Sequence, residues 1–143
     1  MESSEIIEII ARGEDSKNQF KENISNADSL TAEMVAFCNS DGGRIFIGIN
    51  DDGVITGLSS DDVRRINQMV SNTASQNIRP AVNPIVENIM FASGVVMVVS
   101  ISKGISKPYM DKDGAIWVKS GADKRRATSR EEIQRMFQSS SLI

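Results

Sequence analysis

The sequence has 143 residues, a formal net charge of −3, no histidine and a single cysteine, Cys38. These numbers exclude a Ser-His or Cys-His nucleophile pair, a disulfide within the chain and the usual zinc sites. Any metal site must therefore consist of carboxylate and amide oxygens, which favour Mg²⁺, Mn²⁺ or Ca²⁺. No apolar run approaches the roughly 20 residues of a membrane-spanning helix, and the acidic start Met1–Glu5 is unlike a signal peptide. We expect a single domain over residues 1–143 in the cytoplasm, without a membrane partner.

Three segments of the first half have the periodicity of amphipathic helices. They run over Glu5–Arg12, from a cap at Asp28 or Ser29 to about Ser40, and from a cap at Ser59 or Ser60 to about Gln76. Strand patterns lie between them. Ser16–Glu22 predicts an edge strand, and the apolar run Ile45–Ile49 predicts a strand buried on both faces. Asn50–Gly53 predicts a tight turn, and Val54–Leu58 predicts a returning strand.

Strand patterns dominate the second half. Ile85–Phe91 and Val95–Ile101 predict a hairpin that turns at Ala92–Gly94. Ala115–Lys119 predicts a strand whose Trp117 packs in the core. A basic loop follows over Ser120–Arg126. A capping box at Ser129–Glu132 then begins the final helix, and the chain is expected to fray from Gln138.

This mixture of helices and strands lacks a regular βαβ repeat. It predicts an α+β fold, in which helices pack on a mixed, mainly antiparallel sheet within one compact domain. Several strands are candidates for sheet edges. Because an uncovered edge is often paired with another chain, we expect a homodimer.

The stretch Ala36–Gly53 has the pattern Ala-Phe-x-Asn-x-x-Gly-Gly-x-Ile-x-Ile-Gly-Ile-x-Asp-x-Gly. Taken alone, it describes a helix cap followed by a hairpin, since Gly42 and Gly43 can end a helix. Three further segments extend the pattern. They are Gly13–Glu14 with Gln19–Lys21, Lys107–Tyr109 with Trp117–Gly121, and Arg126–Ile133. Together these motifs resemble the Schlafen-type, AlbA-like domain family, which is regarded as DNA-binding, and the resemblance runs from about Gly13 to Phe137.

The resemblance implies candidate metal ligands. Schlafen relatives that cut RNA hold a divalent metal with three carboxylates at these motifs, and the matching positions here are Glu14, Gln19 and Asp51 (or its neighbour Asp52). Because the amide of Gln19 is an uncharged and weaker ligand, the resemblance implies a metal site of Glu14 and Asp51 and weak or absent nuclease activity. Such a nuclease would require Mg²⁺ or Mn²⁺, whereas binding alone requires no cofactor. The structural alternative is that Glu14 pairs on the surface and Asp51 makes the turn.

Charge is distributed unevenly along the chain. Residues 1–63 hold four basic and thirteen acidic side chains, whereas residues 64–130 hold eleven basic and four acidic ones. This asymmetry indicates either a surface that faces nucleic acid or an ordinary mixture of solvated charges. We expect phosphate contacts from one set of residues: Lys107, Lys119, Ser120, Gly121, Lys124, Arg125, Arg126 and Arg130.

Three functions follow from these observations. The first is a nucleic-acid-binding module with a regulatory or defence role, in which the basic loop neutralises phosphates. The second is a metal-dependent nuclease for RNA or single-stranded DNA, and the third is a protein-interaction or dimerisation module. The sequence does not choose between DNA and RNA.

Overall fold

A four-stranded sheet lies at the centre of the fold, in the order β1-β2-β5-β4. The structure is a computed structural model that describes residues 1–139. The helices are α1 (Ser3–Arg12), α2 (Ala27–Cys38), α3 (Ser60–Asn72) and α4 (Arg130–Ser139), with a π-helical turn, η1 (Thr73–Asn77), after α3. The strands are β1 (Asn18–Lys21), β2 (Gly43–Ile47), β3 (Ile78–Arg79), β4 (Ile85–Phe91), β5 (Gly94–Ile101), β6 (Met110–Asp111), β7 (Trp117–Ser120) and β8 (Asp123–Arg126). Helix α4 extends through Gln138 and Ser139, so the expected fraying from Gln138 is wrong for these two residues. The rest of that prediction lies outside the described residues.

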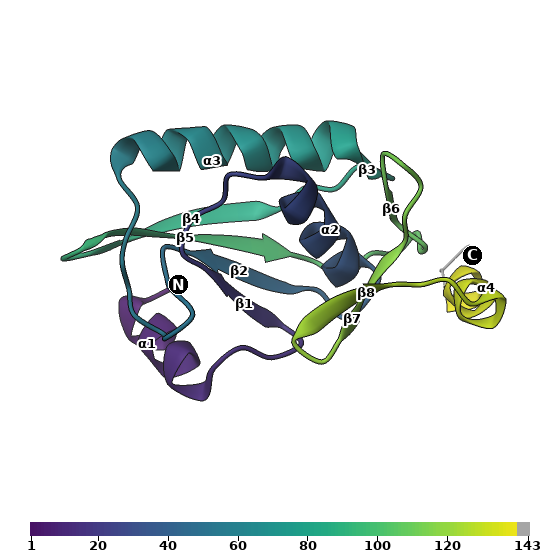
Figure 1. Cartoon of the computed structure of the whole chain (residues 1–143), viewed down its shortest axis with the longest axis horizontal. Coiled ribbons are helices and arrows are strands. Elements are labelled where there is room, and N and C mark those ends of the chain that lie inside the picture. Colours follow the sequence, from purple (N-terminus) through teal and green to yellow (C-terminus); the bar gives the residue numbers. More distant parts are fainter. Residues whose placement is uncertain (140–143) are drawn as a thin grey trace.

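The pairing of the strands confirms the predicted fold class. Strand β1 is parallel to β2, whereas the β2–β5, β4–β5, β3–β6 and β7–β8 pairs are antiparallel. The sheet is therefore mixed and mainly antiparallel, with helices packed on it (Figure 1). Strand β1 is at one edge of this sheet, as predicted for Ser16–Glu22, and β4 is at the other.

Alternation along β2 divides the core between the two faces of the sheet. Ile45 and Ile47 pack in the main cluster with residues of α2 and α3. Phe46 points to the opposite face and packs with Ile6 and Ile9 of α1. Because successive strand residues point to opposite faces, a strand buried on both sides must be apolar throughout. The apolar run Ile45–Ile49 has this pattern, which is why it predicted a buried strand.

Helices α2 and α3 begin at side-chain caps. Ser59 accepts a hydrogen bond from the Asp62 amide (3.1 Å), as predicted for the cap of α3. Helix α2 begins earlier than predicted, since the side chain of Asn26 accepts from the amides of Asp28 and Ser29. These two residues therefore occupy the first turn instead of capping it.

Two segments differ from their predicted conformation. Val54–Leu58 forms only isolated bridges, Ile49 with Ile55 and Leu58 with Val95, because the chain turns at Gly57 (φ +76°) and crosses to the β4–β5 hairpin. The predicted basic loop Ser120–Arg126 instead forms the turn at Gly121 (φ +63°) and strand β8, which pairs with the predicted strand β7 to make a hairpin. Strand β8 has no apolar alternation that would predict it, because all four of its residues are charged.

The hairpin and the last helix form a small unit beside the sheet. Val118, Ala127 and Met136 make a separate apolar cluster that joins the hairpin to α4. Helix α4 stands apart from the sheet in Figure 1. The hairpin is attached to the turn after α2 by the Lys119 amide, which donates to the Ser40 hydroxyl (3.2 Å). Within residues 1–139, no helix has the length and apolar character needed to cross a membrane.

Candidate functional site

An open cleft of about 750 Å³ lies beside strand β1 and the tip of the β7–β8 hairpin. Its lining residues are Glu14, Gln19, Phe20, Lys21, Glu22, Asn23, Asp51, Thr56, Gly57 and Asp123. The fold thus brings together the three residues to which the resemblance assigned metal chemistry, although Asp51 is far from the other two in sequence. Asp52, the alternative to Asp51, is not among the lining residues.

Two acidic residues of this cleft, Glu22 and Asp123, were not predicted from the sequence. Nothing local distinguishes Glu22 from other exposed acids, and Asp123 stands among basic residues. With Glu14 and Asp51 they make four carboxylates, against the single ammonium group of Lys21. The cleft is therefore electronegative, and it repels a polyanion unless cations intervene.

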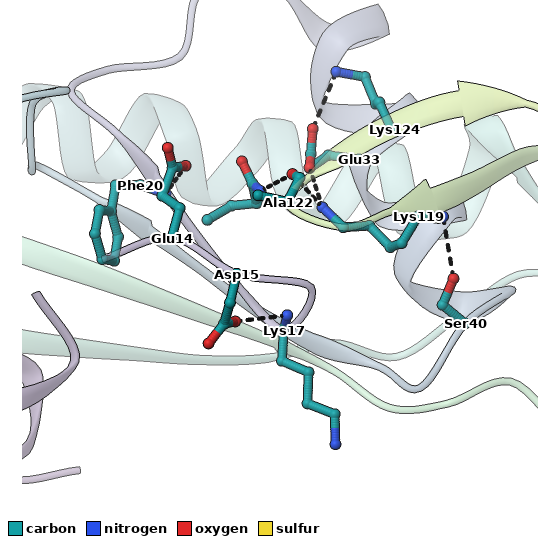
Figure 2. A network of polar contacts seen from close by, with 10 residues as sticks. Glu14, Asp15, Lys17, Phe20, Glu33, Ser40, Lys119, Ala122 and Lys124 are labelled. Atoms are coloured by element: carbon teal, nitrogen blue, oxygen red, sulfur yellow. Dashed lines mark hydrogen bonds and ion pairs between the residues drawn. The ribbon is translucent and has the colours of Figure 1, made fainter. Parts of the chain in front are cut away.

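The polar groups at the cleft are engaged by the backbone. Glu14 Oε2 accepts a hydrogen bond from the Phe20 amide (2.9 Å; Figure 2). The buried Gln19 side-chain amide donates to the Ala122 carbonyl. Among residues 1–139, no three acidic, histidine or cysteine side chains lie close enough to hold a metal ion. In this arrangement the residues do not fit a three-carboxylate metal site, because Gln19 serves as a donor to the hairpin.

A buried ionic network lies behind the hairpin. Glu33 on α2 accepts from Lys119 (Nζ–Oε1 3.3 Å) and pairs with Lys124 (Nζ–Oε2 3.1 Å). Lys119 also donates to the Ala122 carbonyl (2.9 Å) and lies 4.8 Å from the centre of the Phe37 ring. Figure 2 shows both lysines converging on the Glu33 carboxylate. A buried carboxylate between two ammonium groups fixes the hairpin against α2.

Glu33 was not among the predicted site residues, although its position in the helix pattern indicates a buried acid. Glu33 lies three residues after Leu30 and four before Phe37, and both of these are buried on the inward side of α2. Residues at these spacings share a helix face. An acid on an apolar face requires a cation from elsewhere in the fold.

The predicted phosphate-contact residues separate into three environments. Lys119 and Lys124 are engaged by Glu33, and Arg125 pairs with Glu132 on α4 (3.1 Å). Two arginines remain directed to solvent. The guanidinium of Arg126 lies 5.8 Å from the centre of the Trp117 ring, and Arg130 is exposed at the start of α4. At the tip of the hairpin, Ser120 and Gly121 are exposed.

Lys107 lies away from this group. It belongs to the loop between β5 and β6, where burial, and then the charge of Lys103, lower its pKa from the ordinary 10.5 while Asp41 raises it. The prediction that these residues contact phosphates stays a prediction. The fold shows that their cations do not form one uniform exposed cluster.

Comparison with known proteins identifies the family to which this chain belongs. The sequence profile described as Schlafen, AlbA_2 matches residues 14–128. This chain belongs to the Schlafen AlbA_2 family. The family resemblance seen in the motifs is thereby confirmed. A search of curated proteins found no match.

Solved structures share the fold of this Schlafen AlbA_2 chain. The DIP2311 protein from Corynebacterium diphtheriae is 18% identical with a TM-score of 0.64, and the match covers 97% of this chain but 28% of that one. The N-terminal domain of a Nitrosomonas europaea protein, described as related to the ATP-dependent DNA helicase RecG, is 22% identical with a TM-score of 0.56. That match covers 91% of this chain and 97% of that one. This chain thus spans less than a third of the length of DIP2311, and these low identities establish the fold alone.

Proposed function

We propose that this Schlafen AlbA_2 chain binds nucleic acid and contacts phosphates through the β7–β8 hairpin and the first turn of α4. The observation that carries the proposal is the position of Arg126 and Arg130. Both are exposed, and neither belongs to the ion pairs of residues 1–139. Uncompensated arginines on one small unit attract phosphates and release counterions on binding. Family membership supports the same function.

The two hairpin lysines that pair with Glu33 then have a structural role in binding. Lys119 and Lys124 hold the hairpin on Glu33, so that Arg126 and Arg130 are presented from a fixed support. Preorganised cations lose less conformational entropy on binding than free ones. Ser120 and Gly121, exposed at the hairpin tip, can donate further hydrogen bonds to phosphate oxygens.

Fluorescence anisotropy with labelled duplex DNA, single-stranded DNA and RNA tests this proposal. Arg126→Glu with Arg130→Glu should weaken binding at least ~10-fold at moderate salt and lower the slope of log K against log salt. Arg12→Glu with Arg64→Glu is the control, because it makes the same change in net charge. Absence of binding to all three polymers at about 50 mM salt would overturn the proposal, as would equal losses in the two double variants.

A metal-dependent nuclease is the second candidate, because Glu14, Gln19 and Asp51 line one cleft. The donor role of Gln19 weighs against it. The test is incubation of labelled RNA and single-stranded DNA with and without Mn²⁺, using the wild type, Gln19→Glu and Glu14→Ala. Mn²⁺-dependent cleavage that Glu14→Ala removes would support the nuclease. No cleavage by either the wild type or Gln19→Glu would reject it.

Homodimerisation is a further part of the proposal, and strand β4 is the surface for it. This seven-residue strand lies at the open edge of the sheet, with Ile85 65% exposed and Met90 73% exposed. An uncovered edge with apolar side chains favours pairing with a second copy. Light scattering should give a dimer that Met90→Lys weakens, and a monomer at all concentrations would contradict it. The setting that we propose is regulatory or defensive, in the cytoplasm. A chain that dimerises but binds no nucleic acid would instead be an interaction module.

A further inference from the structure

Four cations surround the turn that connects α2 to β2. They are Lys17, Arg44, Lys103 and Lys107, and we call them the sheet-end surface. We propose that the sheet-end surface makes a second set of phosphate contacts with the same polynucleotide that the hairpin binds. This inference rests on the proposed function and adds a second binding surface to it.

The strand directions bring these residues together. Parallel strands β1 and β2 both begin at this end of the sheet, and antiparallel β5 ends there (Figure 1). Lys17 therefore precedes β1, Arg44 lies at the start of β2, and Lys103 follows β5. The Arg44 amide donates to the Lys17 carbonyl (2.8 Å). A Cβ on Gly42 would lie 2.8 Å from the Lys103 nitrogen, so the turn and the end of β5 are in close contact.

The face of Arg44 is polar and is outside the apolar cluster under α1. Arg44 is opposite Asn18 on one side and Ser100 on the other. The next row, which contains Phe20 and Phe46, is the one that packs with α1. Arg44 and its two neighbours are partly exposed. A guanidinium flanked by amide and hydroxyl groups offers several donors to phosphate oxygens.

The acids near the sheet-end surface do not balance its charge. Lys103 is 4.0 Å from Asp41, but both side chains are more than half exposed, so this pair contributes little. Asp15 accepts from the backbone amide of Lys17, and the Lys17 side chain points away from the Glu14 network in Figure 2. Neither Lys17 nor Arg44 belongs to an ion pair in the described part of the chain.

The lowered pKa of Lys107 indicates that its ammonium group lies close to that of Lys103. Its pKa is lowered by burial and then by the charge of Lys103. Bound phosphate would relieve this repulsion, because an anion favours the charged form of both lysines. The crowding is local to the loop after β5.

The turn between α2 and β2 is attached to the hairpin. Ser40, which accepts from the Lys119 amide, immediately precedes Asp41 in the turn. The proposed path of phosphate contacts runs from the hairpin to the sheet-end surface across this turn. The two surfaces together extend the path of phosphate contacts beyond Arg126 and Arg130.

Anisotropy titrations of three double variants test the inference. Arg44→Gln with Lys103→Gln should weaken polynucleotide binding about 10-fold and reduce the salt slope by about 2. Lys17→Gln with Lys103→Gln changes two exposed side chains and should weaken binding likewise, if the Arg44 variant does not fold. The control is Arg12→Gln with Arg64→Gln, on α1 and the start of α3 at the other end of the sheet (Figure 1), and its affinity should be unchanged.

The outcomes separate this inference from the proposed function. If Arg126→Glu with Arg130→Glu weakens binding while the sheet-end variants bind like the wild type, the inference is wrong and the proposed function stands. If the wild type binds no polynucleotide, both are wrong. Polyglutamate and anionic lipid vesicles are included as other polyanions. Equally tight binding to either would overturn the assignment of the sheet-end surface to nucleic acid.

Discussion

The ammonium of Lys119 lies 3.3 Å from the carboxylate of Glu33, and the two side chains are only 3% and 4% exposed. These residues are 86 positions apart in sequence. Their contact joins the hairpin to α2 through two opposite charges that are both buried from solvent. The lysine is therefore part of the support of the hairpin, whereas the sequence indicated a solvent-facing phosphate contact.

Replacement of Glu33 by glutamine should destabilise the protein strongly. It leaves the Lys119 ammonium buried beside a neutral amide, and removing one partner of a buried pair costs about 3–5 kcal/mol. Urea denaturation followed by circular dichroism measures this cost. Glu8→Gln on the exposed side of α1 should change the free energy of unfolding by less than about 0.5 kcal/mol.

The double variant Glu33→Met with Lys119→Met completes this test. Replacing both buried charges with apolar side chains of similar volume is often close to neutral. We expect it to recover more than half of the loss caused by Glu33→Gln. A double variant less stable than Glu33→Gln would show that the network contributes more than the pairing of two charges.

Gly43→Ala should destabilise the start of β2. An added Cβ would overlap the Phe37 ring and lie 2.7 Å from the Lys17 carbonyl, both in well-packed surroundings. Overpacking of this kind costs about 1–3 kcal/mol. Gly114→Ala is the comparison, because its Cβ would meet nothing within 4 Å and only the backbone conformation (φ +83°) opposes it. Thermal denaturation should show the larger loss for Gly43→Ala, and equal losses would contradict the packing argument.

Cys38 should be unreactive in the folded protein. Burial raises the pKa of its thiol from 9.0 to about 11, and only the thiolate reacts with alkylating reagents. This difference alone lowers the thiolate fraction at pH 8 about 100-fold. Iodoacetamide labelling followed by mass spectrometry should be slow in buffer and fast in urea. Rapid labelling of the folded chain would show that α2 opens readily.

The pKa of Lys107 should rise when the neighbouring charge is removed. Lys103→Gln removes the like charge that, together with burial, lowers this pKa. Nuclear magnetic resonance of isotopically methylated lysines measures the shift, and Lys112→Gln, which removes a lysine paired with Asp28, is the control. An unchanged pKa in Lys103→Gln would place the two ammonium groups further apart than the fold indicates.

The lowered pKa of Lys107 makes the stability of the folded protein depend on pH. Because the pKa of Lys107 in the folded state is below the ordinary 10.5, the unfolded chain binds more protons between these two values. The ammonium therefore opposes folding below the folded-state pKa, and stability rises through this interval as the pH increases. Lys107→Met should flatten that rise in urea titrations at alkaline pH.

Much of the fold was predictable from local patterns. The cap at Ser59, the hairpin of Ile85–Phe91 with the strand after it, and the buried strand around Phe46 each follow from a periodicity or a cap within a few residues. Family membership was also predictable, because its motifs are short runs of sequence. Where the local pattern was weak, as in the charged strand β8, the prediction was wrong.

The fold class, the family and the absence of histidine chemistry all follow from the amino-acid sequence. Which charges remain available depends on the folded structure, since a charge finds its partner through space and not along the chain. Glu33 on α2 engages Lys119 and Lys124 from a distant hairpin, and Gln19 on β1 donates to Ala122 at its tip. Burial of a charge requires such a partner. No periodicity or composition along the chain could therefore show which of its cations still face the solvent.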